Sequence, residues 1–414
     1  MDQKQLLVYH NPGIPRPQLV YEGFSNDNEI SEPFIHHRLE KSSDGQTYIH
    51  PLEKYSVSDF VDDVDNEPVK PACMEKTPYT LVEDIDQLKI LAEKLKCVDV
   101  FAVDLEHNSY RSFQGMTCLI QISTRQEDYI VDTLKLRSHV GPQLREVFED
   151  PKKKKVMHGA VNDILWLQRD FGIYLCNLFD THEASQVLNL EKNSLEFLLL
   201  HFCGVTVNKA YQNADWRLRP LPVDMIKYAR EDTHYLLYIH DRMRLELQTA
   251  STGASDPSNL FKVYKQSYNL CMRLYEKRLH TSISYLNIFG LKDANFNSRQ
   301  LSIVRGLYEW RDVVARNEDE SYGYIMPNNT ILNIARQMPP TVDEVTKYGV
   351  NELLKHSAHH YDPELDIITQ IIKDCIKFEF DYEMVTQQKF EPKVEITNYL
   401  PESEYADDED SCQQ

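Results

Sequence analysis

Asp104 and Glu106 are the residues of this chain whose types and spacing point most directly to chemistry. Five of the six residues before Asp104 are apolar and three of those are β-branched, which is typical of a buried strand. Positions two apart on a strand project from one face, so the two carboxylates would lie together. Paired charges in a poorly solvated place are costly, and a hard divalent cation removes that cost. The alternative is that the strand ends at Ala102 and both acids are solvated.

A third acid is predicted to reach the same point from a second segment, which follows Lys155. Val156 and Met157 read as the end of a strand, Gly159 permits a tight turn, and a helix is predicted from about Asn162. Asp163 would then lie in the first turn, where the helix dipole favours an anion. The simpler interpretation is that Asp163 only helps this helix to start.

A third segment places a phenol and an acid on one face of a helix. Tyr228 and Asp232 are four residues apart, so they stack about 5–6 Å from each other on a helix with many apolar positions. The alternative is a Tyr–Asp hydrogen bond within a core. Two divalent ions about 3.5–4 Å apart need bridging and terminal carboxylates, and they suit phosphodiester hydrolysis. The candidate set is Asp104, Glu106, Asp163, Tyr228 and Asp232.

The elements around these residues predict a mixed sheet with helices on its faces. A helix over 84–96, capped by Asp84, precedes the Asp104 strand, and strands over 117–123 and 128–132 follow it as an antiparallel meander. Helical and strand patterns then alternate, which is typical of parallel additions to the same sheet. We expect this α/β domain to span 79–250, after an extended N-terminal arm over 1–78.

The C-terminal part is predicted to be helical. A Ser/Gly/Pro-rich linker opens the segment 251–294, which continues as one long helix over 260–278. A small all-α domain is expected over 295–380, with helices over 298–316, 327–335 and 366–378. The remaining 381–414 form an acidic tail, in which Glu402 to Asp410 hold six acids and no base.

Composition limits the function classes. The net charge of −20 over 414 residues argues against a general nucleic-acid coat, although a bound metal pair would bring about +4 to a phosphate site. The eight cysteines include no CxxC pair, which argues against a zinc site or a disulfide framework. No apolar run approaches about 18 residues and the N-terminus has no signal-peptide pattern, so an intracellular protein without a membrane span is expected.

Longer blocks of the sequence resemble a known family. DLEHNSYRSFQGMTCLIQIST, HGAVNDILWLQ, ADWRLRPLP and YAREDTHYLLY are similar to the RNase D branch of the DEDD-Y 3′–5′ exonucleases, and most of all to the exoribonucleases of the nuclear RNA exosome. EWRDVVARNEDESYGYIMPNNTILNIA resembles the HRDC domain that follows the exonuclease there. The resemblance implies an RNase H-like mixed sheet with flanking helices, a small all-α HRDC domain behind it, and an extended N-terminal arm before it.

The resemblance also implies a role for each candidate residue. Asp104 would be shared by two divalent metal ions, Mg²⁺ with Mn²⁺ as a substitute. Glu106 and Asp232 would complete the nucleophile side, and Glu106 would also meet the terminal 3′-hydroxyl. Asp163 would hold the leaving-group side, and Tyr228 would orient the attacking water.

Contacts to the substrate are predicted for four further residues, namely His107, Trp166, Lys209 and Gln212. His107 would reach the terminal ribose and Trp166 would offer a face for base stacking, whereas the alternative for Trp166 is the core. Lys209 and Gln212 resemble contacts to the terminal nucleotide, and the alternative for Lys209 is a solvated surface lysine.

Two other groups are assigned ordinary structural roles. Lys152 to Lys155 are interpreted as a solvated turn before a strand rather than as an RNA-facing patch. Trp310 is expected in the core of the HRDC domain and Arg311 in a surface ion pair.

The expected activity is metal-dependent, hydrolytic 3′–5′ exoribonuclease action on single-stranded RNA 3′ ends, with release of nucleoside 5′-monophosphates. The family implies a nuclear protein, nucleolus included, that works with the RNA exosome core and nuclear cofactors. The alternatives are a DNA 3′–5′ exonuclease of the kind joined to RecQ helicases and a catalytically silent RNA or cofactor scaffold. No GxxxxGK[ST] loop accompanies the nuclease blocks. We expect the chain to be part of a longer protein, because a cofactor-binding N-terminal domain and a basic tail are usual in the family.

Overall fold

The chain divides into two compact units, which are described separately. The computed structural model describes residues 11, 13–24, 28, 32–43, 45, 47–61, 67–249, 258–348 and 361–377. Unit 1 consists of 1–25, 33–108 and 115–277, and unit 2 of 26–32, 109–114 and 278–414. The linker residues 251–257 and the predicted acidic tail lie outside the described residues.

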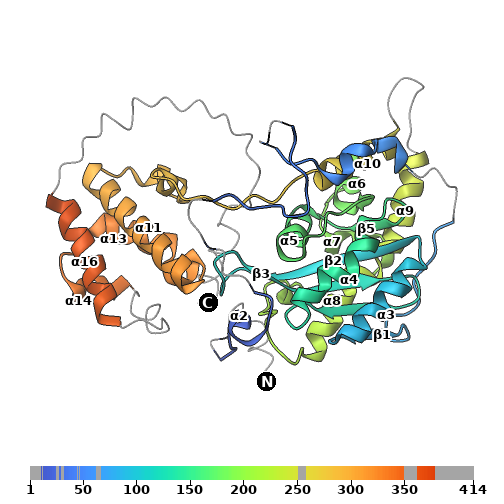
Figure 1. Cartoon of the computed structure of the whole chain (residues 1–414), viewed down its shortest axis with the longest axis horizontal. Coiled ribbons are helices and arrows are strands. Elements are labelled where there is room, and N and C mark those ends of the chain that lie inside the picture. The colour runs from blue at the N-terminus through green and yellow to red at the C-terminus, as the bar shows by residue number, and fades with distance from the viewer. Residues whose placement is uncertain are drawn as a thin grey trace. The chain divides into compact units, whose positions relative to one another are not determined.

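Unit 1 is built on a six-stranded mixed sheet in the order β1-β4-β3-β2-β5-β6 (Figure 1). Strands β2, β3 and β4 pair antiparallel, whereas β1 is parallel to β4, and β5 and β6 extend the other side in parallel. The predicted meander and mixed sheet are confirmed, and β1 is a strand that was not predicted. The strands are β1 (Tyr79–Val82), β2 (Val100–Asn108), β3 (Met116–Ser123), β4 (Asp128–Asp132), β5 (Lys154–Met157) and β6 (Leu178–Asp180).

Helices cover both faces of the sheet. Phe101, Val103 and Leu105 of β2 pack into the largest core with the apolar sides of α3, α4 and α5. Ala102, on the other face, packs with Leu236 and Leu237 of α9, and α8 packs nearby on β3. The main helices are α3 (Ile85–Lys96), α4 (Arg137–Glu149), α5 (Val161–Phe171), α8 (Val223–His234), α9 (Leu236–Thr249) and α10 (Asn259–Cys271).

Short helices fill the connections of unit 1. They are α2 (Pro17–Val20), η1 (Pro51–Lys54), η2 (Val57–Asp59), α6 (Thr181–Val187), α7 (Leu195–Leu198), the π-helical turn η3 (Leu199–Cys203) and η4 (Lys209–Tyr211). Leu52 and Phe60 of the N-terminal arm are buried in the largest core. Parts of the predicted arm are therefore packed against the domain.

The predicted long helix over 260–278 is wrong, because α10 ends at Cys271. The side chain of Gln168 on α5 donates to the backbone oxygen of Arg273 at 2.8 Å and accepts from the amide of Tyr275 at 2.9 Å. These two hydrogen bonds satisfy backbone groups that a continuing helix would pair internally. The helical periodicity of the sequence does not reveal that the Gln168 side chain competes for these backbone hydrogen bonds.

The interpretation of Lys152 to Lys155 as a solvated turn is also wrong for its last two residues. Lys154 and Lys155 begin β5, and Lys155 is fully buried. The ammonium group of Lys155 donates to the backbone oxygens of Asp150 and Lys153, at 2.9 and 2.7 Å. Burial lowers the pKa of Lys155 to about 8. This lysine therefore holds a turn together rather than facing solvent or RNA.

Unit 2 is helical in its described part, as predicted, and α11 is its central helix (Figure 1). Trp310 lies in its core, as expected, whereas the surface position predicted for Arg311 is wrong. Arg311 is 1% exposed, donates to the Met326 backbone oxygen at 2.8 Å and lies over the ring of Tyr322. The helices are η5 (Ser284–Asn287), η6 (Lys292–Ala294), α11 (Ser298–Glu318), α12 (Tyr322–Ile325), α13 (Asn328–Gln337), α14 (Val342–Val345), η7 (Thr346–Tyr348) and α16 (Tyr361–Lys377).

Part of the connection between β2 and β3 belongs to unit 2. Arg111 forms a buried ion pair with Glu320 at 2.7 Å and lies over the ring of Tyr324. The amide of Phe113 donates to Asp319 at 3.1 Å. The six residues 109–114 are thus built into the helical unit by both charge and ring contacts.

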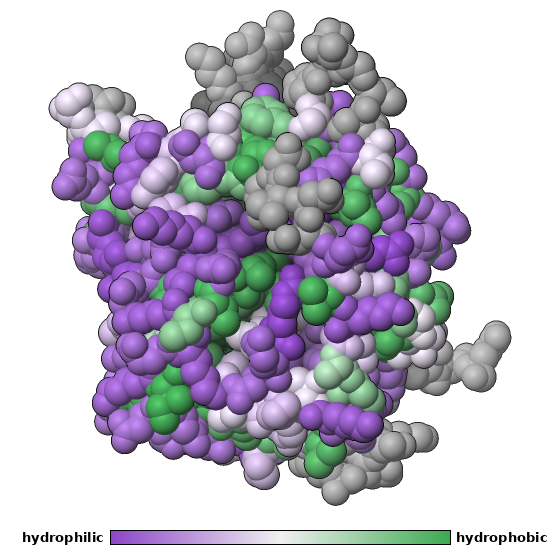
Figure 2. Space-filling view, turned by 90° about the vertical axis from the view of Figure 1, so that its right-hand side faces the viewer, coloured by the Kyte–Doolittle hydropathy of each residue, from purple (hydrophilic) through white to green (hydrophobic). Residues whose placement is uncertain are grey.

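The surface shown in Figure 2 is mostly hydrophilic, with hydrophobic side chains scattered among the polar ones. Within the described residues, none of the helices combines the length and the apolar character that crossing a membrane requires.

Candidate active site

Asp104, Glu106 and Asp232 bring their carboxylates together in unit 1. Both β2 residues lie inside a strand that continues to Asn108, so the alternative that the strand ends at Ala102 is excluded. Their alternation with Phe101, Val103 and Leu105 turns them toward α8, which supplies Asp232. One oxygen from each carboxylate lies within 4.8 Å of the others, a spacing at which the three could hold a metal ion.

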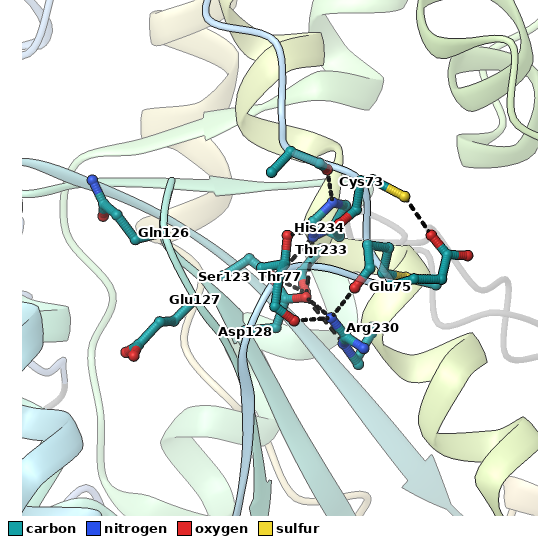
Figure 3. Close-up of polar contacts among 12 residues, drawn as sticks. Cys73, Glu75, Thr77, Ser123, Gln126, Glu127, Asp128, Arg230, Thr233 and His234 are labelled. Carbon is teal, nitrogen blue, oxygen red and sulfur yellow. Dashed lines mark hydrogen bonds and ion pairs between the residues drawn. The ribbon is translucent and has the colours of Figure 1, made fainter.

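A buried polar network fixes the helix that carries Tyr228 and Asp232 (Figure 3). Asp128 of β4 accepts from Arg230 at 2.8 Å and from the Ser123 hydroxyl at 2.8 Å, and it lies 3.1 Å from Nδ1 of His234. The Ser123 hydroxyl also meets that of Thr233 at 2.8 Å. Three side chains of α8 are thereby bound to β3 and β4, which sets the rotation of the helix.

The same network binds the segment before β1. Arg230 donates to the backbone oxygens of Met74 and Thr77 at 2.8 and 3.0 Å, and His234 donates from Nε2 to that of Ala72 at 2.9 Å. Figure 3 shows this segment passing beside the network, with Cys73, Glu75 and Thr77 on it. Residues 72–77 of the predicted arm are therefore part of the support of α8.

Asp163 lies in the first turn of α5, as predicted. The turn before it is held by Asp180 at the end of β6, which accepts from the amides of Gly159, Ala160 and His182 at 2.8–2.9 Å. Asp163 is not within the 4.8 Å group, but it is close enough for the charge of Asp104 to raise its pKa. The structure thus places three candidate acids in one cluster and the fourth beside it.

Glu106, Asp163 and Asp232 are buried, Asp104 is partly buried, and the four acids have no cationic partners among the described residues. Burial raises the pKa of Asp104 to about 7, and burial followed by neighbouring carboxylates raises the pKa values of Glu106, Asp163 and Asp232. None of the four forms an ion pair with a described residue. Other buried acids of unit 1 do have arginine partners, as in Asp128–Arg230, Asp170–Arg137, Asp132–Arg219 and Asp215–Arg217.

This contrast fits divalent cations, because positive charge is the component that the cluster lacks among the described residues. Gln121 supplies a second indication. It is fully buried on β3, its amide donates to Glu106 at 3.3 Å, and its Oε1 accepts no hydrogen bond from the described residues. A hydrated cation would bring donors to that oxygen.

Tyr228 lies one turn before Asp232 on α8, with its ring 6.0 Å from those of Tyr211 and Trp216. Its hydroxyl forms no hydrogen bond with a described residue, so the Tyr–Asp hydrogen bond of the core alternative is not formed. Burial, and then the charge of Asp232, raise the pKa of Tyr228. The phenol is therefore a neutral donor or acceptor beside the acids.

His107 and Trp166 form one stacked pair. Their ring centroids are 4.0 Å apart and their planes differ by 4°. His107 Nε2 lies 3.1 Å from the Arg169 guanidinium, which donates to it, and burial followed by the Arg169 charge lowers the pKa of His107. Trp166 packs at the edge of the largest core with part of its surface exposed. The pair keeps a partly accessible aromatic surface one residue beyond Glu106.

Lys209 and Gln212 are exposed and flank Tyr211, the residue that packs near Tyr228. Lys209 forms an exposed ion pair with Glu196 at 2.7 Å. The structure therefore brings their segment near the phenol, but neither side chain has a contact with the four acids.

Three supporting residues were not predicted from the sequence, namely Gln121, Asp128 and Asp180. The only sign of Gln121 in the sequence was a polar amide between the apolar residues Ile120 and Ile122 of β3. Its role becomes evident only from its pairing with Asp104 on β2. Asp128 begins β4 and Asp180 ends β6. Acids are common in the turns that flank strands, so neither residue stands out in the sequence.

Comparisons with known proteins agree with this architecture. A model of the 3′–5′ exonuclease family matches residues 79–248, and a model of the HRDC domain matches residues 300–359. Protein RRP6-like 2 of Arabidopsis thaliana is 57% identical over 377 residues, which are 90% of this chain and 42% of that protein. Exosome complex component 10 of Rattus norvegicus is 48% identical over 310 residues, 74% of this chain and 35% of that protein.

A solved structure gives the same answer for the fold. The crystal structure of the catalytic core of RRP6 from Trypanosoma brucei superposes with a TM-score of 0.73 at 34% identity, and it covers 88% of this chain and 99% of that chain.

The sheet with its helices and the C-terminal helical unit define a 3′–5′ exonuclease fold followed in the sequence by an HRDC domain. Within that class, the chain belongs to the RRP6 and exosome component 10 family. The predicted family, fold class and HRDC domain are thus confirmed. The chain spans 42% and 35% of the length of the two curated relatives.

Proposed function

We propose that this chain is a metal-dependent, hydrolytic 3′–5′ exoribonuclease that acts on single-stranded RNA 3′ ends and releases nucleoside 5′-monophosphates. The observation that carries the proposal is the set of four buried or partly buried acids, which have no cationic partners among the described residues. Family membership supports the direction of degradation, and the resemblance of the sequence blocks to the RNase D branch supports RNA as the substrate.

The residues that would hold two divalent ions, Mg²⁺ or a substituting Mn²⁺, are Asp104, Glu106, Asp163 and Asp232. Bound there, such ions supply an activated water and stabilisation of the leaving oxygen. Asp104 lies centrally, since its charge affects Glu106, Asp163 and Asp232. Glu106 directly precedes His107 on β2 and is proposed to make a further contact to the 3′-terminal hydroxyl.

Tyr228 orients the attacking water in this proposal. Its raised pKa keeps the phenol protonated, so it acts through hydrogen bonding and does not remove a proton as a phenolate. The rings of Tyr211 and Trp216 near it limit how far it can turn.

The terminal nucleotide is proposed to bind at His107 and Trp166. His107 Nε2 accepts from Arg169, because a guanidinium only donates. In the neutral imidazole the proton is then on Nδ1, which can donate to a ribose hydroxyl. Trp166 offers a stacking surface that tolerates any base. Lys209 and Gln212 are proposed to contact the same nucleotide from η4.

The cellular setting is proposed from the relatives. Rat exosome complex component 10 is named as a component of the exosome, which supports work with the RNA exosome core and nuclear cofactors. It also supports a nuclear location, nucleolus included. Contacts to those partners need not lie in this chain, which covers less than half of that protein.

The test uses a 5′-labelled single-stranded RNA with Mg²⁺, ending in a 3′-hydroxyl or a 3′-phosphate, and a DNA of equal sequence. We expect progressive shortening of the 3′-hydroxyl RNA, slower action on the 3′-phosphate, and little action on DNA. Asp104→Asn should abolish shortening while circular dichroism shows an intact fold. A chain that shortens no RNA with Mg²⁺ or Mn²⁺, or an Asp104→Asn variant with full activity, would contradict the proposal.

A further inference from the structure

Gln121 is the described side chain that touches the acid cluster from the sheet. It pairs with Asp104 across the antiparallel β2–β3 ladder, so both side chains leave the same face of the sheet. Its Nε2 donates to Glu106 Oε1 at 3.3 Å. No other described side chain donates a hydrogen bond to Asp104, Glu106, Asp163 or Asp232. Gln121 therefore contacts the acid cluster through a hydrogen bond but is not one of its carboxylates.

The chemistry of an amide suits this position. A lysine or arginine here would neutralise the acids and compete with a cation, whereas an apolar side chain would leave Glu106 free to turn. A neutral amide donates to one carboxylate oxygen and adds no charge. The hydrogen bond therefore restrains how far the Glu106 carboxylate can turn beside Asp104 and Asp232.

The other end of the amide is buried without a partner among the described residues. Gln121 has no exposed surface, and leaving a buried carbonyl oxygen unpaired is destabilising. A ligand of the predicted metal site that carries a hydrogen-bond donor would give this oxygen the partner that it lacks among the described residues. Water bound to a cation would be a strong donor, and a side chain that accepts a hydrogen bond from it would belong to the second coordination layer.

We propose that Gln121 is a positioning residue of the metal site, which orients Glu106 through Nε2 and accepts a hydrogen bond from metal-bound water at Oε1. This inference rests on the proposed function, because it needs a cation at the acids. Gln121 touches neither RNA nor the reacting phosphate in this proposal. Its effect is on cation affinity and on the geometry of Glu106.

The test compares Gln121→Met with wild type by calorimetric titration with Mn²⁺. Methionine has a similar length and volume but lacks both amide functions, so packing is largely kept. We expect Mn²⁺ affinity to fall about 10–100-fold, the range seen when partners of metal ligands are removed. The Mg²⁺ concentration for half-maximal RNA cleavage should rise in parallel, while KM for RNA at saturating Mg²⁺ stays within about twofold.

Gln168→Met is the matched control. Gln168 is another buried glutamine of unit 1, but its amide contacts the backbone of Arg273 and Tyr275 rather than an acid of the cluster. This variant should lose stability and keep wild-type Mn²⁺ affinity. Gln121→Met should show the reverse, because it removes an unpaired buried atom as well as one long hydrogen bond.

Two outcomes separate this inference from the function beneath it. Wild-type protein that binds Mn²⁺ together with a Gln121→Met variant of equal affinity would overturn the role of Gln121 alone. Wild-type protein that binds no Mn²⁺ would overturn the metal site itself, and with it both proposals.

Discussion

At the scale of single residues, the four acids lower the stability of the folded protein when they are ionised. A buried carboxylate whose pKa is raised binds a proton more readily in the folded than in the unfolded protein. Its contribution to stability is complete below the unfolded pKa and is lost as pH rises through the folded pKa. For Asp104 that window runs from 3.8 to about 7. Cations that bind the ionised acids would oppose this loss.

The first prediction is therefore a stability that depends on pH and on metal. In metal-free buffer, the unfolding free energy of wild type should fall relative to that of Asp104→Asn between about pH 4 and 7, because the asparagine does not ionise. Urea titrations at several pH values, with chelator or with Mn²⁺, measure this difference. Equal pH slopes for the two proteins in chelator would show that Asp104 is not destabilised by burial.

The stacked pair of His107 and Trp166 leads to a second residue-scale prediction. Gly115 has a φ of +75°, and a Cβ there would lie 2.3 Å from Cε1 of His107. Gly115→Ala should displace the imidazole and raise KM for RNA several-fold more than it lowers kcat. Steady-state kinetics on a short RNA would measure both constants.

Gly204→Ala is the control for backbone strain. Gly204 also has a positive φ, of +70°, but a Cβ there meets no described atom within 4 Å. This variant should lose about 1–2 kcal/mol of stability and keep its KM. Equal KM values for the two variants would remove His107 from the nucleotide site.

At the scale of elements, helix α8 depends on its polar contacts with β3 and β4. Asp128→Ala would leave the Arg230 guanidinium buried without its carboxylate, which costs about 3–5 kcal/mol. Urea unfolding at fixed pH would measure this loss. Mn²⁺ affinity should fall as well, because Asp232 lies on the same helix, two residues from Arg230.

Glu127→Ala provides the neighbouring comparison. Glu127 pairs with Lys94, whose side chain is 46% exposed, so removing this carboxylate should cost less than about 1 kcal/mol. If Asp128→Ala were as mild as Glu127→Ala, the network of Figure 3 would not be what holds α8.

The same scale shows what the sequence could and could not predict. The strand before Asp104, the turn before Asp163 and the helix of Tyr228 follow from local periodicity, so the candidate acids could be named from the sequence. Burial of Arg311 and Lys155 is possible because backbone oxygens accept hydrogen bonds from them, that of Met326 from Arg311 and that of Asp150 from Lys155. Local patterns hold no information about such partners, and they assign both residues to the surface.

Gln121 was missed for a related reason. The contact of Gln121 with the acids depends on the strand register that sets Gln121 opposite Asp104. A shift of that register by one residue would turn the Gln121 side chain to the other face of the sheet. The β-bulge between Glu106 and His107 adds to this difficulty, because it changes the pairing at the point where the site residues lie.

At the scale of the whole molecule, unit 2 includes the segment 109–114, which is part of the connection between β2 and β3. Arg111→Ala should lower the free energy of unfolding by about 3–5 kcal/mol, because Glu320 would stay buried without its cation. Thermal unfolding followed by calorimetry would measure it. Arg305→Ala, which removes an exposed pair with Glu309 on α11, should change stability by less than about 1 kcal/mol. Similar losses for both would mean that the Arg111 pair is solvated in solution.

The division of the chain also bears on how such proteins can be recombined. The chain passes from one unit to the other at 25/26, 32/33, 108/109, 114/115 and 277/278, rather than through a single joint. Exchanging the C-terminal part for that of another protein at residue 278 would bring in a new helical unit but leave Arg111 and Phe113 behind with the nuclease. A viable chimera would have to inherit the six-residue insert of the β2–β3 connection together with the helices that bind it, so these distant parts of the gene are expected to be exchanged as a set.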